Sequence, residues 1–364
     1  MMIDNIDRID ELQVHFNKAL FTKRLVSWYQ ANRRDLPWRV RWQENKDPYE
    51  VWVSEIMLQQ TVIKAVIPAY ERFLAAFPSV QDLANAEEDE VRLASRGLGY
   101  YRRFKLMHKG AKDLAQNPEQ IWPETFKGWK EISGVGDYTA AAISSICFDQ
   151  ASPVVDGNVE RVFCRLFDIR LEPNLPKLKR KFFSIGEELI SKRSPGDFNQ
   201  ALMELGQTIC TKQNPSCTLC PVQKSCRAFD NNSQNLAPKA KAKVQYSDVH
   251  MSLYVTQKGS LFGLTQRPKD SKFLKETWGF PTAIKEGKTW QWDGSVGSKW
   301  PLKSKAFATV KHSITSHKIK AEVFHVKADK SLTFRWLKKE DVEENLLSNL
   351  DRKAWKAYLK EHHS

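Results

Sequence analysis

Four cysteines that fall within 17 residues constrain this chain more than any other feature. Cys210, Cys217, Cys220 and Cys226 are separated by six, two and five residues, so their side chains can meet around one centre. Four thiolates suit either a tetrahedral zinc site or an iron–sulfur cluster, and thiol chemistry alone does not separate the two. Zinc ribbons usually offer two pairs of cysteines separated by two residues, whereas this loop has one such pair. Unrelated free thiols are the remaining alternative.

The composition excludes several classes of protein. Hydrophobic residues make up 41% and charged residues 27% of the 364 positions, which is typical of globular proteins. Residues 1–16 lack the apolar stretch of a secretory signal, and residues 138–148 are too short and polar to span a bilayer. We therefore expect a cytoplasmic chain with reduced thiols, no membrane contact, and Cys147 and Cys164 in its core. The net charge of +14 indicates a polyanionic partner, with nucleic acid as the first candidate.

Residues 17–229 have the apolar periodicity of helices, with hydrophobic residues recurring at three and four positions. The segments that match this pattern are 20–29, 49–63, 66–76, 88–95, 138–148, 159–169 and 200–210. The second segment has a clear start, because Asp47 suits the N-cap, Pro48 the first helical position, and Glu50 follows three residues after the cap. The sequence therefore predicts a mainly α domain over residues 1–229.

The pattern changes after the last of the four cysteines. Residues 230–245 are polar, lack aromatic side chains and contain spaced lysines, which predicts a linker. Val249, Met251, Leu253 and Val255 then alternate with other residues, as in a strand. More strand is predicted over residues 307–326 and a helix over residues 339–359. We therefore predict a second, α+β domain over residues 246–364.

Glu55 is the unusual residue of its predicted helix. Its neighbours on the same face are Val51, Trp52, Leu58 and Gln59, and three of these four are apolar. Burial among apolar side chains disfavours the charged form of a carboxyl and raises its pKa. A raised pKa is what a general acid needs near neutral pH. The alternative is a structural glutamate that makes a buried hydrogen bond.

Asp156 directly precedes another predicted helix, within the segment of residues 153–159. An ordinary N-cap aspartate is one explanation of this position. The other is a carboxylate that is exposed at a helix start and stabilises a cationic sugar. One carboxylic acid and one carboxylate in different environments are what glycosidic cleavage through an oxocarbenium-like transition state requires.

Two glycine-containing loops suit contacts with nucleic acid. Gly134, Val135 and Gly136 lie between helices, where glycines allow close approach and the next helix offers free N–H groups to a phosphate. A plain helix–helix turn is the alternative. Residues 97–101 lie among basic side chains, and their flat aromatic rings suit stacking against bases. Those basic residues, Arg96, Arg102, Arg103, Lys105 and Lys109, are otherwise explained as a solvated face.

Taken together, these segments resemble the A/G-specific adenine DNA glycosylases of the endonuclease III superfamily, which are helix-hairpin-helix proteins. The resemblance runs through residues 33–39, 51–61, 97–101, 132–141 and 155–159 and the cysteine loop. In that superfamily the same cysteine spacing holds a 4Fe-4S cluster, so the resemblance implies one here. It also implies base excision repair of double-stranded DNA that contains adenine opposite 8-oxoguanine. We expect a monomer in the bacterial cytoplasm, associated with the nucleoid.

The resemblance also implies roles for individual residues. The residue matching Glu55 protonates adenine N7, and the residue matching Asp156 stabilises the sugar cation with help from the residues matching Tyr138 and Asn158. The implied DNA-contacting residues are Arg34, Trp38, Arg39, Gln60, Leu98, Tyr100, Gly134, Val135, Gly136, Ser316 and His317. Among them, Gln60 and Tyr100 would enter the base stack and Arg39 would line the adenine pocket. Arg34 and Trp38 are equally explained as residues that stabilise the fold.

Tyr138 separates this prediction from the bifunctional glycosylase/lyases of the endonuclease III type. Those enzymes carry a lysine nucleophile at the matching position, and a phenol cannot form a Schiff base. We therefore expect a monofunctional enzyme with little or no lyase activity. A glycosylase/lyase for oxidised pyrimidines and a non-catalytic DNA-binding module with a structural metal remain alternatives.

The C-terminal region resembles the Nudix-like module that recognises 8-oxoguanine in this family. Residues 278–281 match a segment of that fold, and no glutamate-rich hydrolase box follows them, so recognition is expected rather than hydrolysis of oxidised nucleotides. Ser316 and His317 match the end of the family's lesion-reading motif, but Thr315 replaces its phenylalanine. A polar pair at the end of a strand is the alternative explanation of Ser316 and His317.

Overall fold

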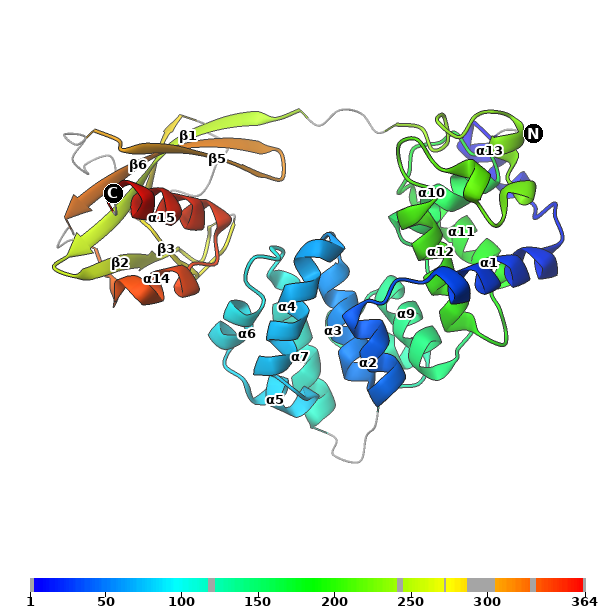
Figure 1. Ribbon diagram of the computed structural model, residues 1–364, viewed down its shortest axis with the longest axis horizontal. Coiled ribbons are helices and arrows are strands. Elements are labelled where there is room, and N and C mark those ends of the chain that lie inside the picture. Colours follow the sequence, from blue (N-terminus) through cyan, green and yellow to red (C-terminus); the bar gives the residue numbers. More distant parts are fainter. Residues whose placement is uncertain are drawn as a thin grey trace. The chain divides into compact units, whose positions relative to one another are not determined.

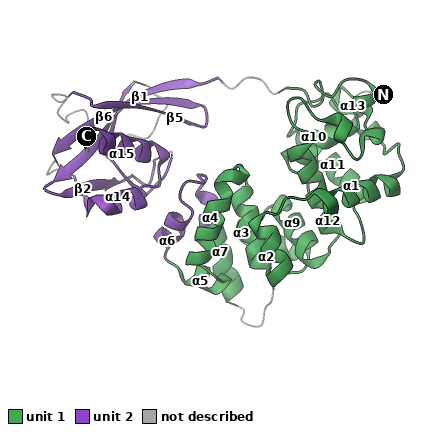
Figure 2. Cartoon of the chain, in the orientation of Figure 1, with its two compact units in different colours: residues 1–86, 105–242 green, residues 87–104, 243–364 purple. Residues whose placement is uncertain are grey.

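The structure, a computed structural model, describes residues 3–116, 122–240, 245–271, 273–286, 305–327 and 332–362. The chain divides into two compact units, of residues 1–86 with 105–242 and of residues 87–104 with 243–364 (Figure 2). Part of the predicted linker, residues 241–244, lies outside the described residues. No helix in the described ranges is long and apolar enough to cross a membrane.

The first unit is helical (Figure 1). Its elements are η1 (Ile6–Glu11), α1 (Lys18–Asn32), α2 (Pro37–Asn45), α3 (Pro48–Leu58), α4 (Ile63–Ala76), α5 (Val80–Asn85), most of α7 (Arg102–Ala115), α8 (Phe126–Lys130), α9 (Asp137–Phe148), α10 (Gly157–Leu166), α11 (Pro176–Leu189), α12 (Pro195–Thr208), η2 (Cys217–Leu219), η3 (Gln223–Ser225) and α13 (Arg227–Asp230). The mainly helical class predicted for this part of the chain is therefore confirmed.

The start of α3 is as predicted, whereas its end is not. Asp47 is the N-cap and accepts a hydrogen bond from the backbone N–H of Tyr49 at 2.9 Å, with Pro48 in the first helical position. The helix ends at Leu58 rather than at residue 63, because Gln60 adopts a positive φ of 56° that no α-helix can contain. The next helix, α4, then begins at Ile63, three residues earlier than predicted.

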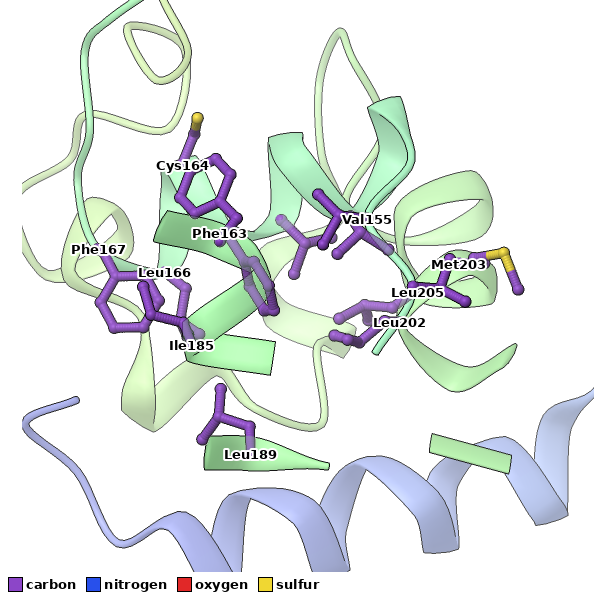
Figure 3. Packing of buried hydrophobic residues seen from close by; sticks show 14 of the residues in the cluster. Val155, Phe163, Cys164, Leu166, Phe167, Ile185, Leu189, Leu202, Met203 and Leu205 are labelled. Atoms are coloured by element: carbon purple, nitrogen blue, oxygen red, sulfur yellow. The ribbon is translucent and has the colours of Figure 1, made fainter. Parts of the chain in front are cut away.

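A large apolar cluster holds α10, α11 and α12 together. Val155, Phe163, Leu202 and Leu205 all belong to this cluster and are buried (Figure 3). Val155 precedes Asp156, and Leu202 and Leu205 flank Met203 and Glu204 on α12. The core therefore fixes the start of α10 against the middle of α12, which is where the candidate site lies.

The second unit contains a mixed sheet with helices, which confirms the α+β class. Its strands are β1 (Ser247–Lys258), β2 (Leu261–Gln266), β3 (Trp278–Gly279), β4 (Thr282–Glu286), β5 (Ala308–Ile314), β6 (His317–Lys327) and β7 (Arg335–Leu337). The main strand order is β3-β2-β1-β6-β5, with β4 also paired to β1 and β7 to β2. β1 and β6 run parallel, and the other pairs are antiparallel.

The predicted alternation in β1 is confirmed. Val249, Met251, Leu253 and Val255 are buried in one cluster, which includes side chains of α14 (Lys339–Asn345) and α15 (Asn349–Glu361). The single helix predicted over residues 339–359 is wrong, since the helical conformation stops between α14 and α15. The hydroxyl of Ser348 caps the new helix by accepting from the N–H groups of Leu350 and Asp351.

A buried ion pair joins β2 to α15 in this unit. The guanidinium of Arg267, just after β2, donates to Asp351 Oδ2 at 2.5 Å, and the two side chains are 5% and 0% exposed. Gly279 of β3 lies against the same guanidinium, since a Cβ on Gly279 would come within 2.2 Å of Arg267 Nη2. The segment of residues 278–281 thus contributes a close-packing glycine to a buried charge pair.

Candidate active site

Glu55 lies on α3 and is buried, as its apolar neighbours predict. Its side chain is one of those that line a cleft of about 920 Å³ in the helical unit. The hydroxyl of Tyr138, on α9, donates to Glu55 Oε2 at 2.7 Å. Burial raises the pKa of Glu55 to about 7; the Tyr138 hydrogen bond and the charge of Arg39 oppose this rise, and the charge of Asp156 adds to it. The group can therefore hold or release a proton near neutral pH.

Asp156 is the N-cap of α10, and its carboxylate faces the same cleft. Oδ1 accepts from the backbone N–H groups of Asn158 at 3.0 Å and Val159 at 2.8 Å. Oδ2 accepts from Asn158 Nδ2 at 2.8 Å. The two explanations of Asp156 from the sequence are thus compatible, because capping the helix is what orients the carboxylate.

Arg161 connects this carboxylate to the cysteine loop. Its Nη2 donates to Asn158 Oδ1 at 3.0 Å and to the carbonyl of Gly206 at 2.6 Å, and its Nε donates to the carbonyl of Cys210 at 2.9 Å. Burial lowers the pKa of Arg161, although a guanidinium stays protonated at neutral pH. The orientation of Asn158 therefore depends on backbone that leads directly into the cysteine loop.

Gly206 allows α12 to approach Asn158 closely. A Cβ on this glycine would lie 2.7 Å from Asn158 Cβ, which is too short for a stable contact, and 3.2 Å from its carbonyl oxygen, which is a tight contact. Gly206→Ala is therefore expected to displace Asn158, to weaken its hydrogen bond to Asp156, and to cost about 1–3 kcal/mol of unfolding free energy through overpacking. Thermal unfolding and the single-turnover rate of base release measure the two effects.

Gly157→Ala is the matched control for that prediction, since a Cβ there meets nothing within 4 Å. It introduces the same methyl group at the start of α10, next to Asn158 in the sequence. Equal losses of stability and rate in the Gly157 and Gly206 variants would contradict the role assigned to close packing at Gly206.

Arg39 and Arg34 converge on Glu204, a buried carboxylate that the sequence analysis did not identify. Arg39 Nη2 donates to Glu204 Oε2 at 2.9 Å, and Arg34 donates to both oxygens of the same carboxylate. Burial acts to raise the pKa of Glu204, but the hydrogen bonds and charges of the two arginines outweigh it and leave that pKa lowered. The carboxylate fixes the Arg39 guanidinium, which also lies over the ring of Tyr29.

The structure brings together most of the predicted pocket residues. Those that line the cleft are Trp38, Arg39, Glu55, Tyr138, Asp156 and Asn158. Arg34 is not among the residues that line the cleft. It pairs with Glu204 and donates to Gln207 Oε1 at 2.6 Å. Cys147 also lines the cleft, so the prediction that it is a core residue is wrong, whereas Cys164 is fully buried.

A group of cleft residues that sequence reasoning missed shares one face of α12. Gln200, Met203 and Gln207 line the cleft, Glu204 lies behind it, and the four follow the spacing of three and four that marks one side of a helix. Gln200 Oε1 accepts from Arg39 Nε at 3.1 Å. A glutamate within an otherwise apolar helical segment was the available signal, the same one that identified Glu55.

The four predicted cysteines line a second, smaller cavity. Cys210, Cys217, Cys220 and Cys226 surround it together with Arg165, whose Nη1 lies 3.3 Å from Cys210 Sγ. Within the described ranges, no three histidine, cysteine, aspartate or glutamate side chains converge on a point that a single metal ion could occupy. The four cysteine side chains therefore lie around one cavity.

Arg165 anchors this cysteine loop. Its guanidinium donates to the backbone carbonyls of Thr211, Lys212, Gln234 and Ala237. A cation so placed compensates negative charge on nearby sulfur atoms. The donor set and the local charge therefore fit an anionic iron–sulfur centre.

The glycine hairpin lies between α8 and α9. Gly134 has a φ of +84°, and a Cβ there would lie 2.6 Å from Leu106 Cβ, so both its conformation and its surroundings require glycine. Val135 is buried, whereas Gly136 is the N-cap of α9 and has open space where a side chain would be. No side chain of the described residues caps the start of α9, and uncapped N–H groups at a helix start can bind a phosphate oxygen.

The other predicted DNA contacts differ in exposure. Gln60 is exposed and belongs to the first unit, while Tyr100 has a positive φ of 51° and is 62% exposed in the second unit. Leu98 is buried, at 8% exposure, so it supports its loop instead of projecting from it. Arg103 is also buried, which removes it from the predicted basic surface, whereas Arg102, Lys105 and Lys109 are exposed.

Ser316 and His317 lie where β5 turns into β6. His317 is buried and its Nδ1 makes a 2.5 Å hydrogen bond with Ser247 Oγ, and the Ser316 carbonyl accepts from the Ser247 N–H. Thr315 has a φ of +50°, a strained conformation for a β-branched residue. His317 therefore stabilises the turn, while Thr315 and Ser316 are the residues that remain at its surface.

Comparisons with known proteins agree with this geometry. Residues 53–187 match the model of the "HhH-GPD superfamily base excision DNA repair protein". An adenine DNA glycosylase of Arabidopsis thaliana is 39% identical over 297 residues, which are 71% of this chain and 47% of the relative. Another from Buchnera aphidicola subsp. Schizaphis graminum is 31% identical over 274 residues, 75% of this chain and 78% of the relative.

The solved structure of a thermostable thymine-DNA glycosylase resembles the helical part. It is 25% identical, with a TM-score of 0.52, and the match covers 59% of this chain and 97% of that chain. This chain spans less than half the length of the plant and mammalian relatives it matches.

Proposed function

This chain belongs to the adenine DNA glycosylase family, and we propose that it hydrolyses the N-glycosidic bond of adenine paired with 8-oxoguanine or guanine in duplex DNA. The observation that carries the proposal is the pair of carboxyl groups facing one cleft. Glu55 has a pKa of about 7, while three hydrogen-bond donors hold the Asp156 carboxylate. An acid and an anion in different environments are the requirement for this chemistry.

The bond is broken in one balanced step followed by addition of water. Protonated Glu55 gives its proton to N7 of an adenine that has been flipped out of the duplex, and the C1′–N9 bond breaks with its electron pair on the base. Asp156 stabilises the positive charge that develops on the sugar, and water then adds at C1′ and passes its proton to the Glu55 carboxylate, which restores the acid. Arg39, held by Glu204 and Gln200, is placed to orient the base within the cleft.

A single-turnover assay tests this proposal. Duplexes with adenine opposite 8-oxoguanine, opposite guanine and opposite thymine are incubated with excess protein, and abasic sites are revealed by hot alkali. We expect rapid release opposite 8-oxoguanine, slower release opposite guanine and none opposite thymine. Iron-loaded protein that releases adenine from none of the three would contradict the proposal.

We also propose that the enzyme is monofunctional. Tyr138 holds its proton, because burial raises the pKa of its phenol well above the usual value, and a phenol cannot form a Schiff base. Among the described residues that line the cleft, Lys46 alone carries an amine, and its ammonium lies over the Trp42 ring. Borohydride reduction on abasic DNA should therefore trap no covalent complex.

The cysteine loop is proposed to hold a 4Fe-4S cluster. Four cysteines that line one cavity supply the four thiolate ligands that such a cluster needs. Such a cluster, when bound, would keep the loop folded and so support the Arg161 contact to Asn158. Iron and sulfide analysis of the purified protein distinguishes this cluster from zinc.

For the second unit we propose a role in recognising 8-oxoguanine. The support is the turn at Thr315 and Ser316, in a segment where Ser316 and His317 match the end of the family's lesion-reading motif and Thr315 replaces its phenylalanine. This role is measured by the ratio of the rate of adenine release opposite 8-oxoguanine to the rate opposite guanine.

A further inference from the structure

The loop of residues 97–101 is fastened to the C-terminal fold within the second unit. The hydroxyl of Tyr101 donates to the carbonyl of Leu347 at 2.9 Å and accepts from the backbone N–H of Gly97 at 3.2 Å. The hydroxyl thus donates its one hydrogen to the Leu347 carbonyl and uses a lone pair to accept from the loop backbone. Burial raises the pKa of Tyr101, so the hydroxyl remains a donor at neutral pH.

A second contact lies beside the first. Arg96 Nη1 donates to the carbonyl of Glu344 at 3.2 Å, and Arg96 Nη2 lies 3.8 Å from the carboxylate of the same residue. A Cβ on Gly97 would come 3.8 Å from Arg352 Nη1, so the loop backbone itself lies close to α15. These contacts involve both side chains and backbone.

The partner segment is part of the rigid core of the C-terminal fold. Glu344 belongs to α14, and Leu347 lies between α14 and α15. Leu346, Leu347 and Leu350 are all buried, with exposures of 0%, 6% and 1%. The Leu347 carbonyl that accepts the Tyr101 hydrogen bond therefore has little freedom to move.

Tyr100 is the residue that this arrangement presents to solvent. It has a positive φ, lies between Gly99 and Tyr101, and is 62% exposed, whereas Leu98 below it is buried. The carbonyl of Leu98 accepts from Arg103 Nη2 at 3.2 Å, which closes the base of the loop. A non-glycine residue keeps such a conformation only where its surroundings hold it.

We propose that Tyr101 and Arg96 are positioning residues through which the C-terminal fold sets the loop conformation that presents Tyr100 to DNA. The inference rests on the proposed function, in which Tyr100 enters the base stack. It adds that lesion recognition and insertion of Tyr100 are coupled through the protein, since one rigid segment supports both the C-terminal core and the loop.

The experiment uses full-length Tyr101→Phe, which keeps the ring and removes only the hydroxyl, and Arg96→Met, which keeps the length of the side chain. Tyr246→Phe is the matched control, since Tyr246 is exposed in the same unit and its ring lies under the Lys318 ammonium. Amide hydrogen exchange of residues 97–101 is measured in the free protein. Loss of one hydrogen bond should speed this exchange about fivefold in Tyr101→Phe and leave it unchanged in Tyr246→Phe.

A functional readout accompanies the exchange measurement. Insertion of Tyr100 is followed by the fluorescence of 2-aminopurine placed beside the 8-oxoguanine, and base release is timed on the lesion and guanine duplexes. Both positioning variants should insert less, and the ratio of the lesion rate to the guanine rate should fall. The midpoint of the pH dependence of base release should not change, because Glu55 is untouched. General misfolding would change this midpoint as well as the ratio of the two rates.

Two results would overturn the inference. Unchanged exchange in both variants would mean that the contacts do not hold the loop, and faster exchange with wild-type insertion and rate ratio would mean that they do not position Tyr100. Wild-type protein that released no adenine would contradict the proposed function instead, and exchange and fluorescence would still report the coupling.

Discussion

Glu55→Gln is expected to abolish adenine release and, at the same time, to stabilise the protein above pH 7. General acid catalysis contributes about 10²- to 10⁴-fold to such reactions, and an amide cannot supply the proton. The stability gain has a separate cause. The pKa of Glu55 is about 7 in the folded chain against an ordinary value of 4.5, so folding opposes ionisation of this carboxyl.

The sign of the pH effect follows from the pH at which Glu55 loses its proton in the unfolded and in the folded chain. The unfolded chain releases it near pH 4.5 and the folded chain near pH 7, so the folded state of the wild type loses stability as pH rises through this window. The difference in unfolding free energy between Glu55→Gln and wild type reaches its full value of about 3 kcal/mol above pH 7 and is small below pH 4.5. Denaturant unfolding of both proteins at pH 5 and pH 8.5 measures it.

Wild-type base release should also decline as pH rises through about 7, because only protonated Glu55 can act as the acid. Glu44→Gln is the matched control, since Glu44 is exposed on α2 and does not line the cleft. A Glu55→Gln protein that retains wild-type rates would remove Glu55 from the mechanism. One that is inactive but no more stable at pH 8.5 would show that the carboxyl is not held in its neutral form by burial.

Asp351→Ala is expected to cost about 3–5 kcal/mol of unfolding free energy in the second unit, because it leaves a buried guanidinium without its carboxylate. Arg267 and Asp351 are almost fully buried, and Gly279 packs directly against the guanidinium. Replacing both charges, as in Arg267→Met with Asp351→Leu, should restore much of the loss, since no unpaired charge remains. Hydrogen exchange of β1 in denaturant reports the stability of this unit separately.

The exposed pair of Lys285 and Glu322 provides the contrast. Both side chains are well exposed, at 38% and 40%, so Glu322→Ala should change stability by less than about 1 kcal/mol. If Asp351→Ala were as mild as Glu322→Ala, the buried pair would contribute little. If the double replacement were as damaging as Asp351→Ala, lost packing and not an unpaired charge would be the cause.

Much of the local structure was predictable because short-range chemistry determines it. Asp47 and Pro48 mark the start of α3, and the period-two alternation of Val249 through Val255 marks the buried face of β1. The burial of Glu55 follows from its helical neighbours in the same way. The end of α3 was not predictable, because the positive φ of Gln60 leaves no signature in the residue type itself.

The missed features are those that depend on distant partners. Glu204 carries the same signal as Glu55, a carboxyl in an apolar helical segment, but its arginine partners are about 170 positions away along the chain. Arg103 belongs to a basic run in the sequence, yet the fold buries it and lowers its pKa to about 10. The break between α14 and α15 depends on Leu346 and Leu347 packing into the core.

The hydrogen bond between Tyr138 and Glu55 has a stereochemical consequence. While the phenol donates to Oε2, the acidic hydrogen of neutral Glu55 lies on the other oxygen, Oε1. In this arrangement the carboxylic acid has one tautomer, and the direction of its O–H bond is set before any nucleotide arrives. A base that enters the cleft in a different orientation would face the wrong oxygen, so the same hydroxyl that tunes the acidity of Glu55 also acts as a geometric filter on the substrate.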